Sequence, residues 1–297
     1  SPIVIYGDYD ADGICSVAIL YLFFKSLGAE VYWYVPERDE GYGINSEAVD
    51  FIKENYNPSL FISADCGITA VNEVEYIKRL GMDVVVTDHH NSAGNLPRCI
   101  AINPKLSASY PFRELCGAGV ALKLVQALGG IGEAKKYMDI AAIATVADSV
   151  ELLGENRDIV AEGLKIMNGS PRPAVAKLCE LTGFKEGINT YVLAFGIVPR
   201  INAAGRVGEA KRAVSLFCEE DEEAIDNLCR QLDFANAERQ RICDEIFSAA
   251  KEQIEREGML SSSVIAVTDE SCRDGVSGIV ASRLCEQFCR PAFVFCE

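Results

Sequence analysis

The amino-acid sequence predicts an α/β protein in which a doubly wound parallel sheet is followed by a long connecting helix and the start of a second α/β domain. In the first third of the chain, short apolar runs alternate with longer amphipathic segments, which is the pattern of βαβ units. Residues 116–216 then change to mainly helical spacing of apolar side chains. Residues 220–257 contain neither proline nor glycine, and their amphipathic pattern predicts one helix of roughly 50 Å at 1.5 Å per residue.

The individual elements follow in a regular order along the chain. Five apolar runs are the expected strands of the first sheet: 3–6, 31–35, 60–64, 82–87 and 99–102. The segments between them predict helices over 14–27, 46–55 and 71–80. Gly28 follows the first helical pattern, in the position where helices commonly end. After Gly258, the second domain is expected to begin with a strand, a helix and a strand over 264–267, 277–288 and 292–295.

These elements divide the chain into three predicted parts. With 297 residues, of which 49% are hydrophobic, the chain can build one full α/β core and part of another. We expect a first domain over 1–218, a long connecting helix over 219–257 and an incomplete second domain over 258–297. The abrupt ends at Ser1 and Glu297 favour a chain trimmed from a longer protein.

Composition narrows the class of protein. No run of about 18 uncharged apolar residues occurs, and the sequence opens on a strand pattern instead of a signal peptide, so we expect a cytoplasmic protein without a membrane partner. The 12 cysteines include no Cys-x-x-Cys pair, which predicts reduced thiols. A net charge of -16 argues against an extended nucleic-acid surface, although bound divalent cations would offset part of it locally.

The only two histidines of the chain, His89 and His90, stand side by side behind Asp88, directly after the predicted fourth strand. Neutral imidazole is the commonest side-chain metal ligand, and open α/β sheets bind ligands at the carboxyl ends of their strands. This placement predicts a metal or phosphate site. A structural pair that caps the strand is the alternative for these three residues taken alone.

Carboxylates follow the other strands that can lie beside the fourth. The first strand runs into Asp8, Asp10 and Asp12, which alternation places on one side if the backbone stays extended. The third strand ends in Asp65, and a later predicted helix ends in Asp148. Like charges this close are costly unless cations neutralise them. A lone Asp-x-Asp is more often a solvated turn, so it is the four clusters together that predict a shared site for Mn²⁺ or Mg²⁺.

Four short motifs at these positions resemble those of the DHH phosphoesterases. They are Asp-Tyr-Asp-Ala-Asp-Gly at 8–13, Asp-Cys-Gly at 65–67, Asp-His-His at 88–90 and Val-Ala-Asp at 146–148. Further strings resemble the RecJ-type exonucleases of that superfamily: Pro-Glu-Arg at 36–38, Gly-Tyr-Gly at 41–43, Asn-Pro-Lys at 103–105, Cys-Gly-Ala-Gly at 116–119 and Asn-Ala-Ala-Gly-Arg at 202–206. The resemblance spans nearly the whole chain and implies a 5′-to-3′ exonuclease specific for single-stranded DNA.

The resemblance implies two divalent metal ions, with Mn²⁺ preferred over Mg²⁺. The implied ligands are Asp10 and Asp65 for one ion and Asp12, Asp65, His89 and Asp148 for the other. Tyr6 stands where many members carry a metal-binding histidine, so the first ion either lacks an imidazole or takes Asp8 instead. The two ions would activate a shared water and stabilise the leaving oxygen.

The resemblance also implies roles around the ions. His90 would donate to the scissile phosphate and Asp88 would accept from an imidazole N–H, so these two and the bridging Asp65 are the expected catalytic residues. The expected phosphate contacts are Arg38, Arg200, Asn202 and Arg206, with Tyr42 as a candidate for stacking on a base. Surface ion pairs are the alternative for the arginines, and local packing is the alternative for the tyrosine. Arg273 occupies a place where the associated domain often has histidine.

The function expected from these features is a metal-dependent phosphodiesterase that releases mononucleotides from the 5′ end of single-stranded DNA, with roles in DNA repair and recombination. A single-strand-binding protein is a candidate partner. One alternative is a phosphodiesterase for short oligonucleotides or cyclic dinucleotides, which would need less binding surface. The other is a non-catalytic replication scaffold of the same fold. The intact aspartate and histidine set disfavours the scaffold, because a binding module does not need so costly a cluster of charge.

Overall fold

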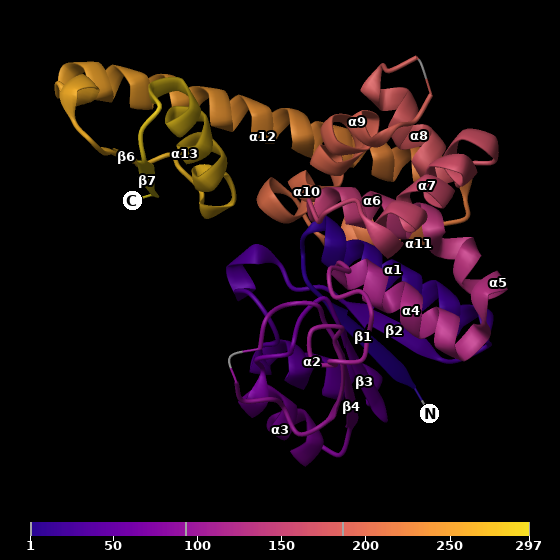
Figure 1. Cartoon of the computed structure of the whole chain (residues 1–297). Helices are drawn as coiled ribbons and strands as arrows, with labels where there is room; N and C mark the ends of the chain where they lie inside the picture. Colours follow the sequence, from indigo (N-terminus) through magenta and orange to yellow (C-terminus); the bar gives the residue numbers. More distant parts are fainter. Residues whose placement is uncertain (1, 93, 186, 297) are drawn as a thin grey trace.

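The computed structural model describes residues 2–92, 94–185 and 187–296. The first residue of the predicted first domain, Ser1, and the last residue of the predicted second domain, Glu297, lie outside the described residues. A five-stranded sheet forms the centre of the larger part of the molecule (Figure 1). All neighbouring strands are parallel, in the order β2-β1-β3-β4-β5. Their bounds are β1 Ile3–Gly7, β2 Val31–Tyr34, β3 Leu60–Ala64, β4 Asp83–Thr87 and β5 Ile100–Ile102. The predicted doubly wound sheet is confirmed, with strands one, three and four as neighbours.

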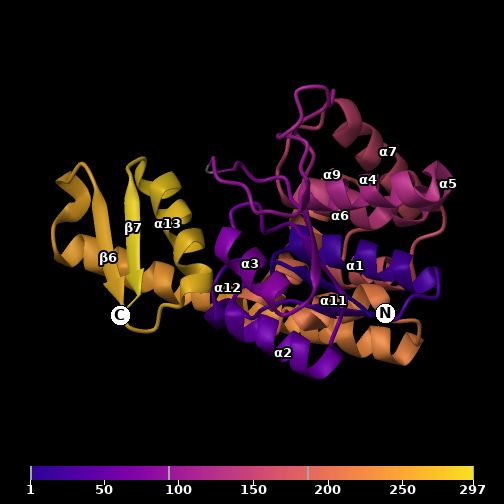
Figure 2. The ribbon, with the colours of Figure 1, turned by 90° about the horizontal axis from the view of Figure 1, so that it is seen from below.

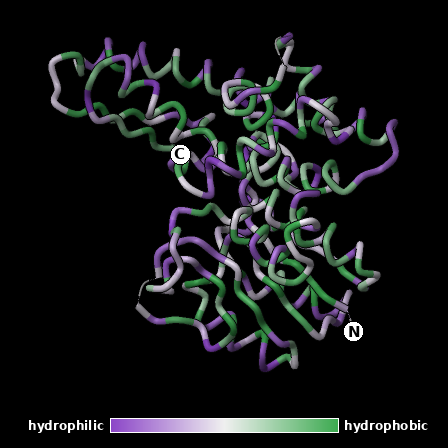
Figure 3. The backbone as a smooth tube through the Cα atoms, turned by 45° about the vertical axis from the view of Figure 1, so that its right-hand side comes forward, coloured by the Kyte–Doolittle hydropathy of each residue, from purple (hydrophilic) through white to green (hydrophobic). Residues whose placement is uncertain are grey.

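Helices cover both faces of this sheet because alternate strand residues are apolar on each side. Ile5 and Ile62 belong to a core with α1 (Ala11–Ser26), α4 (Gly117–Gly129) and α6 (Met138–Ala147). Val4, Phe61 and Val86 point the other way, into a smaller core with α2 (Ser46–Tyr56) and α3 (Val71–Arg79). The strands are therefore mainly hydrophobic along their length (Figure 3).

The region from residue 116 to 216 is helical, as predicted, and packs on the α1 side of the sheet (Figures 1 and 2). Its remaining helices are α5 Ile131–Ala134, α7 Gly154–Gly169, α8 Pro173–Thr182, α9 Thr190–Val192, α10 Val198–Val207 and α11 Lys211–Cys218. The helices α9 and α10 are continuous through a π-helical turn at Leu193–Ile197. Short 3₁₀ turns occur at Arg38–Glu40 and Lys135–Tyr137.

The helix α12 (Glu222–Arg256) has 35 residues and joins two separate cores (Figure 1). Its first half places Ile225 and Leu232 in the main core. Its second half packs Ile246 and Ile254 against the C-terminal unit, which we define as β6 (Ile265–Asp269), α13 (Asp274–Phe288) and β7 (Ala292–Cys296), preceded by a 3₁₀ turn at Met259–Ser261. Each half of the predicted long helix therefore packs in a hydrophobic core. The division of the chain into three parts stays a prediction.

The cysteines correct one expectation. Cys272 and Cys296 form a disulfide within the C-terminal unit, so the prediction that all thiols are reduced is wrong for this pair. The cause lies in the pairing of β6 with β7, which brings together two cysteines separated by 24 residues. Ten further cysteines are free. Among the described residues, no helix is both long and apolar enough to cross a membrane.

Candidate metal centre

The predicted strand-end residues meet at one edge of the sheet. Because β1, β3 and β4 are adjacent and parallel, the residues that follow them, Asp8, Asp65 and Asp88, emerge at the same edge. Asp148 reaches this edge from the C-terminal end of α6. Sequence positions as far apart as 8 and 148 therefore contribute to one cluster of carboxylates and imidazoles.

The backbone after β1 differs from the extended path assumed for the three aspartates. Asp10 caps α1, and its Oδ1 accepts hydrogen bonds from the N–H groups of Asp12 (2.9 Å) and Gly13 (3.0 Å). The helix consequently begins at Ala11 instead of residue 14. Simple alternation along a strand is the wrong geometry here, because Asp12 already lies in the first helical turn.

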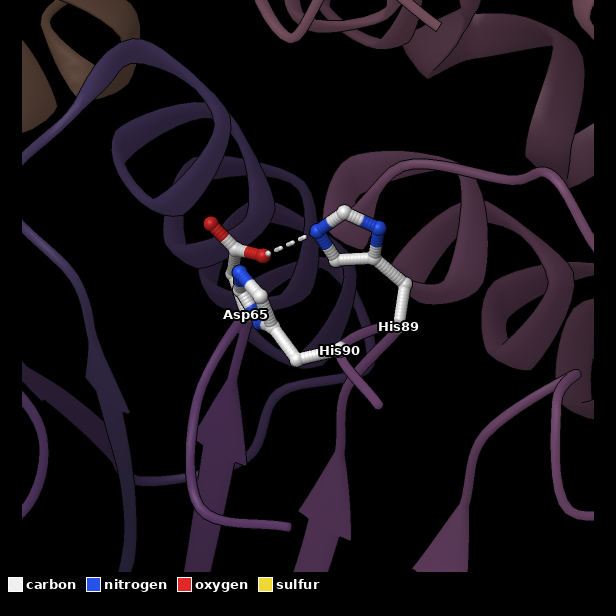
Figure 4. A group of neighbouring side chains, drawn as sticks. All are labelled: Asp65, His89 and His90. Atoms are coloured by element: carbon white, nitrogen blue, oxygen red, sulfur yellow. Dashed lines mark ion pairs between the residues drawn. The ribbon is translucent and has the colours of Figure 1, made fainter. Parts of the chain in front are cut away.

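The donor atoms form three groups that could each hold an ion, and two of these groups share no residue. The third group, Asp65, His89 and His90, overlaps both of the others (Figure 4). Asp8, Asp10 and Asp65 present ligand atoms within 4.8 Å of one another, and so do Asp12, His89 and Asp148. His89 connects the groups, because its Nε2 lies 3.2 Å from Asp65 Oδ1 and 3.7 Å from Asp12 Oδ2. Its Nδ1 lies 3.8 Å from Asp148 Oδ2. Figure 4 shows the His89 ring directed at the Asp65 carboxylate.

The surroundings of the Asp65 side chain suit a carboxylate that binds a cation better than a carboxylate without one. Its Oδ1 is buried and has no hydrogen-bond partner among the described residues, which costs about 1–3 kcal/mol for a polar group. Its backbone lies in the left-handed region at a φ of 63°, an uncommon conformation for a residue with a side chain. A Cβ added at Gly117 would lie only 2.4 Å from Asp65 Oδ1. Glycine at this position therefore leaves space for the carboxylate.

Asp12 is held by the start of α4. Its Oδ2 accepts from the N–H of Gly117 at 2.6 Å, and its Oδ1 accepts from that of Ala118 at 2.8 Å. The N-terminus of a helix is a favourable site for an anion. The Cys-Gly-Ala-Gly string at 116–119 thus positions a candidate ligand and makes room for Asp65, two tasks that sequence reasoning did not assign to it.

Burial and mutual repulsion shape the electrostatics of the cluster. Burial, with the Asp10 charge, raises the pKa of Asp8 to about 7 and that of Asp148 to about 6. The same causes raise the pKa of Asp12, and burial with the Asp12 charge raises the pKa of Asp65 well above its usual range. Burial and the neighbouring His90 lower the pKa of His89 to about 4, which keeps its imidazole neutral and able to bind a cation.

Asp88 supports His90. Its Oδ1 lies 2.8 Å from His90 Nδ1 and also accepts from the backbone N–H groups of His89 and His90. Its Oδ2 accepts from the Ile68 N–H at 2.9 Å. Burial alone would raise the pKa of Asp88, but these hydrogen bonds lower it, and the same contact raises the pKa of His90. His90, whose side chain is 45% exposed, thus has a fixed ring with its Nε2 free of Asp88.

Tyr6 does not replace a ligand. Its hydroxyl donates to the carbonyl of Gly43 at 2.8 Å, so it supports the loop that carries Tyr42. The φ values of Gly41 and Gly43 are 93° and 87°, a conformation that favours glycine, and between them Tyr42 is largely exposed. The centre of its ring lies 6.4 Å from that of His90, edge to face.

Arg38 and Arg206, two of the four predicted phosphate contacts, line a cavity of about 580 Å³. This cavity lies between the part of the chain built on the five-stranded sheet and the C-terminal unit. Arg38 donates through Nε to the Gly205 carbonyl, and its guanidinium lies 4.5 Å from the centre of the Tyr9 ring. Arg206 donates through Nη1 to the Gly275 carbonyl at 2.7 Å. Burial and the charge of Arg38 lower the pKa of Arg206, so the two guanidinium groups act on one another beside this cavity.

The other two predicted contacts, Arg200 and Asn202, make hydrogen bonds within the fold, and their contact with phosphate stays a prediction. Arg200 donates to Asp233 Oδ1 (2.8 Å) and to the carbonyls of Gly196 (2.7 Å) and Leu181 (2.9 Å), which uses all three nitrogens to fix the π-helical turn. Asn202 Oδ1 accepts from the Ala11 N–H at 2.8 Å and supports the first turn of α1. The fold therefore uses the whole Arg200 guanidinium, but only the Oδ1 of Asn202.

The fold and this cluster define an α/β protein with candidate metal ligands at the carboxyl edge of a parallel sheet. A family model described as the DHH family, N-terminal domain, matches residues 2–146. The single-stranded-DNA-specific exonuclease RecJ of Bacillus subtilis is 42% identical over 98% of this chain and 37% of its own length. That of Thermus thermophilus is 36% identical over 99% of this chain and 43% of its own.

A crystal structure of exonuclease RecJ bound to manganese superposes with a TM-score of 0.88 and 35% identity, over 99% of this chain and 75% of that one. The chain belongs to the DHH family, in its RecJ branch. It spans less than half the length of the two curated relatives named above.

Proposed function

We propose that this chain is the catalytic part of a metal-dependent exonuclease that removes mononucleotides from the 5′ end of single-stranded DNA, with Mn²⁺ preferred over Mg²⁺. The observation that carries the proposal is the buried, unpartnered Oδ1 of Asp65 between two groups of ligand atoms. The names of the relatives support the substrate, and solved structures of relatives with Mn²⁺ and with Mg²⁺ support these two ions as candidates.

The ligand sets follow from the two groups of donor atoms that share no residue. Asp8, Asp10 and Asp65 would hold one ion, which includes Asp8 in place of the imidazole that Tyr6 does not supply. The residues for the second ion would be Asp12, Asp65, His89 and Asp148. Carboxylate oxygens with one neutral imidazole suit Mn²⁺ and Mg²⁺ better than structural zinc.

Bound in these sets, two divalent ions would supply a nucleophilic water and stabilise the leaving oxygen. The protein would contribute the positions of the reacting groups. Asp88 holds the His90 ring, and His90 Nε2 would donate to an oxygen of the scissile phosphate. Arg38 and Arg206 would bind the terminal 5′-phosphate, with Tyr42 stacked on the first base.

The decisive experiment compares three substrates with Mn²⁺: a 5′-phosphorylated single strand, a dinucleotide and a cyclic dinucleotide. We expect the single strand to be degraded fastest, with mononucleotides released from its 5′ end and no turnover in a chelator. Faster turnover of either dinucleotide would favour the short-substrate phosphodiesterase. Binding of the single strand without turnover of any substrate would favour the scaffold.

A second experiment tests the end-binding arginine. Arg206→Lys keeps the charge and removes the planar fork that grips a phosphate, so the loss should be larger for 5′-phosphorylated than for 5′-hydroxyl strands. Equal losses would assign Arg206 to its contact with Gly275 between the two units.

The cellular context is also part of the proposal. A nuclease for single-stranded DNA would act in the cytoplasm, in repair and recombination, where single strands are covered by single-strand-binding protein. That protein is the partner we propose, and co-purification of the two from the cytoplasmic fraction is the test.

A further inference from the structure

The Asn-Pro-Lys string at 103–105 is hydrogen-bonded to the edge of the sheet that carries the candidate metal ligands. The N–H of Asp88 donates to the carbonyl of Ile102 at 3.0 Å, which joins the end of β5 to the end of β4. Asn103 is buried, and its Nδ2 donates to the carbonyl of His90 at 2.9 Å. Asn103 Oδ1 in turn accepts from the N–H of Lys105 at 2.9 Å. The position of Lys105 is therefore fixed relative to His90.

Lys105 carries a positive charge that the protein leaves unpaired. Within residues 2–92, 94–185 and 187–296, its ammonium has neither an ion pair nor a hydrogen bond, although the side chain is half-buried. Burial and the charge of His90 lower the pKa of His89 most, and Lys105 lowers it further. Lys105 also opposes the rise that burial and Asp10 cause in the pKa of Asp148. Its charge thus acts on the ligand group of His89 and Asp148.

The cations around the cluster separate into two sets, each beside a different group of ligands. The Arg38 guanidinium lies 4.5 Å from the ring centre of Tyr9, the residue between Asp8 and Asp10, and donates to the carbonyl of Gly205, the residue before Arg206. The arginines therefore lie on the side of the group that contains Asp8 and Asp10. Lys105 lies on the side of the group that contains His89 and Asp148. A strand whose scissile phosphate lies over both groups would have cations on either side of the reacting bond.

We propose that the Lys105 ammonium binds the phosphate immediately 3′ of the scissile phosphodiester, in the part of the strand that the enzyme retains. This inference rests on the proposed exonuclease function, in which the arginines hold the 5′-phosphate. The arginine set and Lys105 together fix the polarity of the strand across the metal centre. Lysine suits this role because its ammonium is a point charge that adapts to phosphates of different geometry.

The test uses a 5′-phosphorylated oligonucleotide and a matched one in which only the linkage between the second and third nucleotides is a neutral methylphosphonate. For Lys105→Gln on the first oligonucleotide, we expect roughly a 10- to 100-fold loss in affinity measured with Ca²⁺ and in kcat/KM measured with Mn²⁺. On the methylphosphonate, the variant and the unaltered protein should be equal, because the partner of the ammonium is gone. Lys105→Arg should recover most of the loss.

Two controls separate this role from a structural one. Lys123→Gln removes a lysine that is already paired with Glu155 at 3.3 Å, and it should have the same small effect on both oligonucleotides. Calorimetric titration with Mn²⁺ should give the same two sites for Lys105→Gln as for the unaltered protein. An equal loss on both oligonucleotides, or a loss of metal binding, would overturn the proposal. Turnover of the unmodified strand by the unaltered protein tests the exonuclease function separately.

Discussion

Replacing Asp65 by asparagine should make the metal-free protein more stable and the metal-bound protein less stable. Asp65 is 2% exposed, and burial and the Asp12 charge raise its pKa, so ionising this carboxyl group in the metal-free folded protein is unfavourable. Asparagine has the same shape and tolerates the φ of 63° at this position. Its amide N–H can donate to His89 Nε2, which lies 3.2 Å from Asp65 Oδ1.

The size of the effect follows from the unpartnered oxygen. A buried polar atom without a partner costs about 1–3 kcal/mol, so Asp65→Asn should stabilise the metal-free protein by about that amount. Each kcal/mol should raise the Tm by roughly 2–4 °C. At a Mn²⁺ concentration of 100 times the Kd, a single site would stabilise the unaltered protein by about 2.7 kcal/mol. Asp65→Asn should lose most of this gain, because both ligand sets include the residue.

The assay is thermal or denaturant unfolding of both proteins in a chelator and in excess Mn²⁺. The order of stability should reverse between the two conditions. Asp139→Asn is the matched control, because Asp139 is equally buried but paired with Arg172 Nε at 3.0 Å. That variant should be less stable in both conditions. If Asp65→Asn instead lowered stability in the chelator and kept the full response to Mn²⁺, the bridging role would be wrong.

Four further predictions follow from the same geometry and electrostatics. His90→Ala should bind Mn²⁺ as before in calorimetry yet lose turnover, because Asp88 holds the His90 ring and we assign His90 to the substrate; loss of a metal site would make it a ligand beside Asp65 and His89. Gly117→Ala should weaken Mn²⁺ binding, because its Cβ would lie 2.4 Å from Asp65 Oδ1; unchanged affinity would show that the carboxylate can move aside. Mn²⁺ affinity should fall as the pH drops through about 7 and then about 6, where Asp8 and Asp148 take up protons that compete with the ion. In a chelator the raised pKa of Asp8 has the opposite consequence: stability should fall as the pH rises from about 4 to about 7, because the folded state keeps a proton that the unfolded chain releases near 3.8. A flat pH profile in both titrations would contradict the electrostatics.

Much of the fold could be read from local pattern. The alternation of strands and helices, the mainly helical region and α12 were all predicted, because hydrophobic periodicity reflects which face of each element is buried. Element starts were less accurate: α1 begins three residues early because Asp10 caps it, and α13 begins at Asp274 instead of residue 277. Such starts depend on capping contacts that periodicity does not record.

The sequence by itself determined which residues gather at the metal centre. Parallel strands end at the same edge of a sheet, so residues directly after β1, β3 and β4 approach one another once these strands are neighbours, as the structure has them. Only the tertiary structure decided what the remaining polar groups contact. The packing of α4 gives Asp12 its two N–H partners, and the packing of α10 gives Arg200 and Asn202 their hydrogen bonds within the fold. The physical reason is the separation of the partners along the sequence, which reaches 191 positions. The geometry of such contacts depends on how the helices pack and not on any local sequence pattern.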